Sequence, residues 1–168
     1  MPSVVCPGCG LRLDTADRGF DAKFHASCAC LQLYWELSAF TLTIWEPDFI
    51  HQLAVDAYAA QHAAPDTKPI RTAFALMGLG LTFERGFTGR EVQLAHIEMG
   101  KSRTEWPASR PPPLISMITV QDVLNDDLPI NYRDTLRKWS MSVWDYWKPD
   151  HERIRRLLEV YFDPSINR

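Results

Sequence analysis

The feature that most constrains this chain is the placement of its cysteines, because all 4 lie between Cys6 and Cys30. They form two groups, a CPGCG turn at 6–10 and a CAC segment at 28–30. Two thiolates on a tight turn can bind one ion, and a second pair about 20 residues later suits the other half of a tetrahedral site. The pattern predicts zinc as a cofactor, bound by an N-terminal arm.

The second cysteine pair leaves the ligand set open. Two sulfurs in a C-x-C pair must bind one ion with a more constrained geometry than those in the usual C-x2-C pair. In addition, a helix that begins at Ser27 would aim Cys28 and Cys30 about 200° apart. In that case a histidine, either His25 or His51, can complete the site. The candidate metal ligands are therefore Cys6, Cys9, Cys28, Cys30 and His51.

Two other interpretations of the cysteines compete with zinc. A C-P-x-C pair can be a thiol–disulfide redox centre, but that fold needs a strand before the motif, and few residues precede Cys6. The four thiols can also be buried side chains without a common role. Zinc is favoured over both because the CPGCG turn and a second cysteine pair occur together. Metal binding would also explain how a polar arm is held to the rest of the chain.

Beyond the arm, the apolar residues recur with a helical period. We expect an all-α fold, a helical bundle of about five to six helices with an irregular zinc-knuckle N-terminal arm. The clearest helices are expected over 27–43, 69–85, 89–100 and 132–147, and another is expected to start near Pro47. The segment 69–85 is apolar on almost every side, which places it in the middle of the bundle.

The length of 168 residues and the 46% hydrophobic content predict one domain over residues 1–168. We expect a cysteine-bearing arm over 1–26, the first helices over 27–100, a Pro-rich connection over 101–118 and C-terminal helices over 119–168. The longest largely apolar run, 73–83, is shorter than the roughly 20 residues that span a bilayer. Without a signal sequence at the start, we expect a cytoplasmic protein that does not bind membranes.

The histidines of the second expected helix point to another kind of site. His51, Tyr58 and His62 share one face of that helix, with small side chains between them. His51 and His62 lie about 16 Å apart along the axis, so at most one of them can belong to a given metal centre. We expect His51, at the helix start, to reach the cysteine arm. His62 is expected to pair with Asp66 or to interact with the C-terminal end of its helix.

Two hypotheses about function follow. The favoured one is a small zinc-binding protein with a structural zinc and a binding or accessory role. The alternative is a metalloenzyme that uses the metal together with proton carriers, so the sequence leaves open whether the chain is an enzyme. Four protein ligands on zinc would favour the first hypothesis, and three ligands with a water would favour the second. The candidate catalytic residues are His51, Asp56, Tyr58, His62 and His96.

The partners that we expect are a small molecule or another protein. Any small-molecule site should lie between the second and fourth helices, around Tyr58, His62 and His96, where small side chains leave room for a ligand. The net charge of −3 argues against a nucleic-acid partner, because proteins that bind the phosphate backbone of nucleic acids usually carry an excess of basic residues.

Several segments resemble a bacterial family that is known only as a domain of unknown function. The resemblance rests on the CPGCG turn, on Cys30 with Tyr34, and on the HQLAVDAY segment at 51–58 with the Gln61-His62 pair after it. It covers nearly the whole chain, but it implies no established reaction.

The resemblance does bear on the metal ligands. The family pattern has one cysteine where this chain has two, and the match falls on Cys30. The ligand set that the resemblance implies is Cys6, Cys9, Cys30 and a fourth residue such as His51. Cys28 would then be an additional cysteine outside the site.

Overall fold

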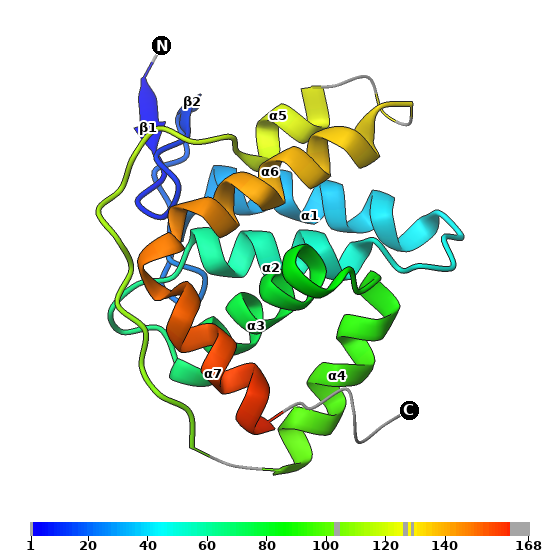
Figure 1. Cartoon of the computed structure of the whole chain (residues 1–168). Coiled ribbons are helices and arrows are strands. Elements are labelled where there is room, and N and C mark those ends of the chain that lie inside the picture. Colours follow the sequence, from blue (N-terminus) through cyan, green and yellow to red (C-terminus); the bar gives the residue numbers. More distant parts are fainter. Residues whose placement is uncertain (1, 103–104, 126–127, 129, 162–168) are drawn as a thin grey trace.

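The computed structural model describes residues 2–102, 105–125, 128 and 130–161. In these ranges the chain forms an N-terminal arm followed by seven α-helices (Figure 1), which confirms the mostly helical prediction and exceeds the expected number of helices. The helices are α1 (Cys28–Thr43), α2 (His51–Gln61), α3 (Pro69–Arg85), α4 (Gly89–Ser102), α5 (Val120–Asn125), α6 (Tyr132–Tyr146) and α7 (His151–Tyr161), with a 3-10 turn at Lys148–Asp150.

The arm contains two short antiparallel ribbons. Strand β1 (Ser3–Val5) pairs with β2 (Arg12–Asp14), and β3 (Phe20–Asp21) pairs with β4 (Ala26–Ser27). Strands of this length are too short to show the two-residue alternation that identifies a strand in a sequence. The CPGCG turn connects β1 to β2, so the first cysteine pair lies at the end of a hairpin.

Local signals place the start of α1 correctly but not the start of α2. Ser27 is the N-cap of α1, as predicted, and its hydroxyl accepts a hydrogen bond from the Cys30 amide at 3.2 Å. The start of α2 near Pro47 is wrong, because Phe49 adopts a left-handed φ of 52° that interrupts the helix. The Glu46 carboxylate instead accepts the Ile50 amide at 2.7 Å, just before the first turn.

Helices α1 and α2 lie against each other and run in opposite directions. At one end, the Thr41 hydroxyl lies 2.8 Å from Nδ1 of His51. At the other end, Cys30 Sγ lies 3.5 Å from Nε2 of His62, which immediately follows α2. The C-terminal end of α2 is therefore next to the first turn of α1, where the second cysteine pair is located.

Helix α3 lies in the middle of the bundle, as its sequence predicts (Figure 1). Its side chains Leu76, Met77, Leu79 and Leu81 are fully buried. Helices α2, α4, α6 and α7 all contact it. No helix in the described parts of the chain is long and apolar enough to cross a membrane.

The Pro-rich segment between α4 and α5 runs along the outside of the bundle (Figure 1). Over 105–119 it forms neither helix nor strand. The Tyr146 hydroxyl donates to the Pro112 carbonyl, and the Arg153 guanidinium donates to the Ser109 hydroxyl at 2.7 Å. These bonds fasten the segment to α6 and α7.

Candidate metal centre

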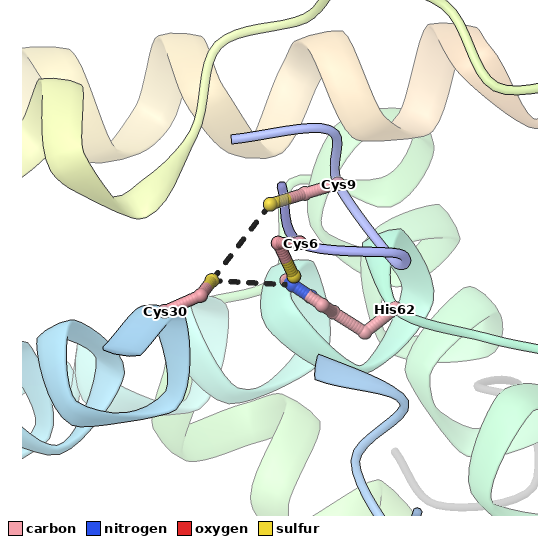
Figure 2. A group of neighbouring side chains, drawn as sticks. All are labelled: Cys6, Cys9, Cys30 and His62. Atoms are coloured by element: carbon pink, nitrogen blue, oxygen red, sulfur yellow. Dashed lines mark hydrogen bonds between the residues drawn. The ribbon is translucent and has the colours of Figure 1, made fainter. Parts of the chain in front are cut away.

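Four potential ligand atoms meet where the arm, α1 and the end of α2 come together. They belong to Cys6, Cys9, Cys30 and His62, and all lie within 4.8 Å of one another (Figure 2). The Cys9 and Cys30 sulfurs are 3.7 Å apart, and Cys30 Sγ is 3.5 Å from His62 Nε2. Tetrahedral zinc would separate two sulfurs by about 3.8 Å, and a sulfur from a nitrogen by about 3.5 Å. The group therefore has the spacing to hold one zinc-sized ion.

The hairpin turn presents Cys6 and Cys9 toward the helices. The Cys6 amide donates to the Leu11 carbonyl and the Gly10 amide donates to the Cys6 carbonyl, both at 2.8 Å. Gly10 closes the turn with a φ of 76°, a conformation that glycine adopts without strain. Both thiols are thereby held on one side of a tight loop (Figure 2).

Gly8 leaves the space that the His62 ring occupies. A Cβ at this position would lie 2.4 Å from Cδ2 of His62 and 2.6 Å from the His25 carbonyl oxygen. We expect Gly8→Ala to weaken metal binding about 10–100-fold, because the methyl group shifts the ring of a ligand without removing it. Competition with a chromogenic chelator measures the loss.

The matched control for this substitution is Gly100→Ala. A Cβ at Gly100 has no neighbour closer than 3.9 Å, so this variant should have the metal affinity of the unaltered protein. Equal metal affinity of the Gly8 and Gly100 variants would contradict the packing of Gly8 against His62.

Only one cysteine of the CAC segment faces the cluster. Cys30 is fully buried in it, whereas Cys28 is partly exposed and packs against Gly19. The Cys28 amide donates to the Gly19 carbonyl at 2.9 Å. Because α1 begins at Cys28, side chains two positions apart point about 200° from each other. Cys28, a candidate ligand from the sequence, therefore lies outside the group.

The His62 ring is oriented as a metal-ligating histidine requires. Its Nδ1 lies 2.9 Å from the Tyr58 carbonyl oxygen. A carbonyl can only accept, so Nδ1 carries the hydrogen and Nε2 keeps its lone pair toward the cysteines. The ring also stacks on Tyr58, with centroids 3.8 Å apart, which restricts its rotation.

The other histidines that the sequence offered for this site lie elsewhere. His51 is at the far end of α2, where its Nδ1 contacts the Thr41 hydroxyl, and burial lowers its pKa. His25 packs its ring against Phe20. The structure thus brings His62, and neither His51 nor His25, to the cysteines.

The signal that identifies His62 is the arrangement of two helices joined by a short connection. Such helices usually pack antiparallel, so the end of the second helix returns to the start of the first. Cys30 is in the first turn of α1, and His62 directly follows the last turn of α2. The helical periodicity of α2 alone does not predict that His62 lies next to Cys30.

The electrostatics of the cluster favour a bound cation. Hydrogen bonding with Cys30 lowers the pKa of Cys6 and raises the pKa of Cys9, and hydrogen bonding with Cys6 raises the pKa of Cys30 to about 12. Without a cation, one thiolate therefore disfavours ionisation of the others in this buried site. A divalent cation removes that penalty and allows all three sulfurs to bind as thiolates.

Tyr58 supports the same cluster from α2. Its hydroxyl lies 3.5 Å from Cys30 Sγ. Burial raises the pKa of Tyr58, so the phenol stays protonated and its hydroxyl can donate a hydrogen bond to a Cys30 thiolate. The other face of the Tyr58 ring stacks on Tyr34, with centroids 4.1 Å apart.

The remaining candidate catalytic residues lie at a separate cavity. Asp56 and His96 line it together with Tyr58, whereas His62 faces the cysteines. His96 contacts the Phe74 carbonyl oxygen at 2.9 Å, and burial lowers its pKa to about 4. Tyr58, His62 and His96 were expected to surround a small molecule. Tyr58 and His96 do line one cavity, but His62 does not.

Comparison with known proteins identifies a family but no activity. One family model, described as a family of unknown function (DUF5946), matches residues 4–148. The matched range includes the three cysteines and the histidine of the cluster. No curated protein and no solved structure matches the chain.

Proposed function

Because this chain belongs to the DUF5946 family, whose description names no activity, we propose a function from the site itself. The protein is a small zinc-binding helical protein in which Cys6, Cys9, Cys30 and His62 hold one structural Zn²⁺. The observation that carries this proposal is the convergence of four nitrogen and sulfur ligands from three separate segments on a volume of zinc size.

A closed, structural site is favoured over an open one. Structural zinc takes four protein ligands, whereas catalytic zinc keeps a position for water or substrate. Cys6 and Cys30 are 0% exposed, and Cys9 and His62 are 3% exposed. Four buried ligands fill a tetrahedron and leave little room for a reacting molecule.

Such a zinc would hold the N-terminal arm against the helices. The arm's ribbons are too short to be stable alone, and Val5 and Phe20 remain 45% and 54% exposed. A metal that joins the hairpin to α1 and α2 contributes its binding free energy to folding. The protein would then act through its bundle in a binding or accessory role, in the cytoplasm, where thiols stay reduced.

A metalloenzyme is the second candidate, and one observation favours it. A cavity of about 490 Å³ adjoins Cys9 and is also lined by Arg12, Thr119 and Asp122. A ligand in this cavity would approach the metal from the Cys9 side. Ligand count separates the two candidates, since X-ray absorption at the zinc edge distinguishes four protein ligands from three and a water.

We expect protein purified without added metal to contain about one zinc per chain. Elemental analysis measures the metal, and amide hydrogen exchange measures the order of residues 2–27. Removal of zinc by a chelator should raise exchange in the arm far more than in α3, because the metal connects the arm to the helices. A metal-free protein with a fully protected arm would refute the structural role.

A further inference from the structure

A second cavity, of about 280 Å³, lies where the arm and four of the helices meet. It is lined by Phe24 of the arm, Tyr34 of α1, Ala59 of α2, Arg71 of α3 and His96 of α4, among others. Its volume is near the lower end of the range of about 300–1,000 Å³ for ligand pockets, which limits an occupant to a small molecule.

Much of the cavity wall is apolar. The alkyl side chains of Val55, Ala59, Ile70 and Ala75 line it together with aromatic rings. The small side chains of the two alanines leave room between the helices. A molecule that fills this space gains most from an apolar body, because its surface then leaves water for an alkyl and aromatic surrounding.

Asp56 and His96 add no charge to the cavity at pH 7. The Asp56 carboxyl is 3% exposed, its Oδ1 accepts from the Gln52 amide at 3.1 Å, and its Oδ2 lies against Gly78 without a hydrogen-bond partner among the described residues. Ionisation there would leave a buried charge with one neutral donor, so Asp56 keeps its proton, and burial raises its pKa well above the usual value. His96 Nε2 donates to the Phe74 carbonyl at 2.9 Å, and burial lowers its pKa to about 4.

Arg71 therefore gives the cavity its charge, and its guanidinium is held in place. The guanidinium carbon lies 4.4 Å from the centre of the Phe24 ring, and Nη1 donates to the Lys23 carbonyl at 2.8 Å. Among the described residues, Arg71 forms no ion pair and no other side-chain hydrogen bond. Because a guanidinium carries five N–H donors, most of them remain for a ligand.

The surroundings of Arg71 add positive charge. The Lys23 ammonium lies 5.5 Å from the centre of the same Phe24 ring. The Asp21 carboxylate accepts the Phe24 amide at 2.9 Å and forms no ion pair with Arg71. Two cations beside an apolar cavity attract an anion to its entrance, where Arg71 itself is only half-buried.

The donors of the cavity suit one carboxylate. The planar fork of a guanidinium matches the two oxygens of a carboxylate with two parallel hydrogen bonds. A phosphate group has further oxygens and more charge, and the apolar walls would leave these without partners.

We propose that this cavity binds a small carboxylic acid with an apolar body of about one ring, whose carboxylate accepts hydrogen bonds from Arg71. This inference gives a location and a ligand class to the binding role proposed above, and it rests on that role. It does not depend on the identity of the metal, because none of the four cluster residues lines the cavity.

The test uses three probes that share a phenyl ring and differ in the charge of their polar end: phenylacetate, phenylacetamide and 2-phenylethylamine. Titration calorimetry at pH 7 on the zinc-loaded full chain should show phenylacetate binding at least about tenfold more tightly than the uncharged amide, with the amine weakest. Equal affinity for acid and amide, or no binding of the acid at millimolar concentration, would overturn the proposal.

A matched pair of variants assigns the carboxylate to Arg71. Arg71→Gln should remove the preference for the acid over the amide. Arg137→Gln should not, although the Arg137 guanidinium also lies over an aromatic ring, 5.3 Å from the centre of Phe83, because Arg137 does not line this cavity. A preference for the acid that persists in Arg71→Gln refutes the inference.

Ala59→Leu tests the location without altering any charge. The larger side chain fills the cavity and leaves Arg71 intact, so it should weaken phenylacetate binding at least about tenfold. If Arg71→Gln does not fold, this variant keeps the proposal testable. Unchanged phenylacetate binding in Ala59→Leu would place the ligand elsewhere and contradict the cavity site.

Zinc content, measured on every sample, separates this proposal from the structural zinc. A protein that holds zinc but does not discriminate among the probes refutes the acid site alone. A protein that is folded without zinc and still prefers the acid refutes the structural metal alone.

Discussion

His62→Ala is expected to abolish stable zinc binding, whereas His51→Ala is expected to leave it intact. His62 Nε2 is 3.5 Å from Cys30 Sγ, while His51 contacts Thr41 at the opposite end of α2. Loss of a direct ligand should weaken zinc binding by more than about 100-fold, since changes in outer residues alone cost 10–100-fold. The melting temperature of the His62 variant should fall together with its zinc content, because binding and folding are coupled.

The cysteines provide a second matched pair for the same measurement. Cys30→Ser should release zinc, and Cys28→Ser, the same change two positions away, should retain it. Cys30 is fully buried among the other ligands, whereas Cys28 packs outside them against Gly19. Zinc loss in the Cys28 or His51 variant, with retention in the Cys30 or His62 variant, would show that the ligand set is wrong.

Trp139→Ala is expected to destabilise the zinc-loaded protein by about 3–5 kcal/mol. Trp139 is 0% exposed, and its Nε1 donates to the Gln61 side chain at 2.9 Å. The amide of Gln61 in turn donates to the Ile118 carbonyl at 2.8 Å. The substitution therefore opens a cavity in the core and leaves a buried acceptor without its donor, in the last turn of α2 beside His62.

Unfolding by denaturant measures this effect, and Trp45 is its control. Trp45 is 97% exposed, so Trp45→Ala should change the free energy of unfolding by less than about 0.5 kcal/mol. Trp139→Phe keeps most of the buried area and isolates the lost hydrogen bond, for which we expect about 1–3 kcal/mol. A Trp139→Ala protein as stable as the Trp45→Ala protein would disprove the packing described for α6.

The helices could largely be predicted because their ends depend on neighbouring residues. Ser27 caps α1, Pro69 begins α3, and Gly86 ends α3 with a left-handed φ of 68°, each through an interaction within one or two turns. The start of α2 could not be read in this way. Phe49 adopts a positive φ that no local preference of phenylalanine predicts, and the helix begins only after it.

The ligands of the metal centre likewise include some that local sequence predicts and one that it does not. The sequence by itself determined that Cys6 and Cys9 lie on one tight turn, and that a helix starting at Cys28 directs only one of its two cysteines to a given side. Only the tertiary structure decided that the fourth residue is His62. That choice depends on the antiparallel packing of α1 and α2, which brings together two residues 32 positions apart. Packing of apolar faces sets this distance, and no periodicity within one helix encodes it.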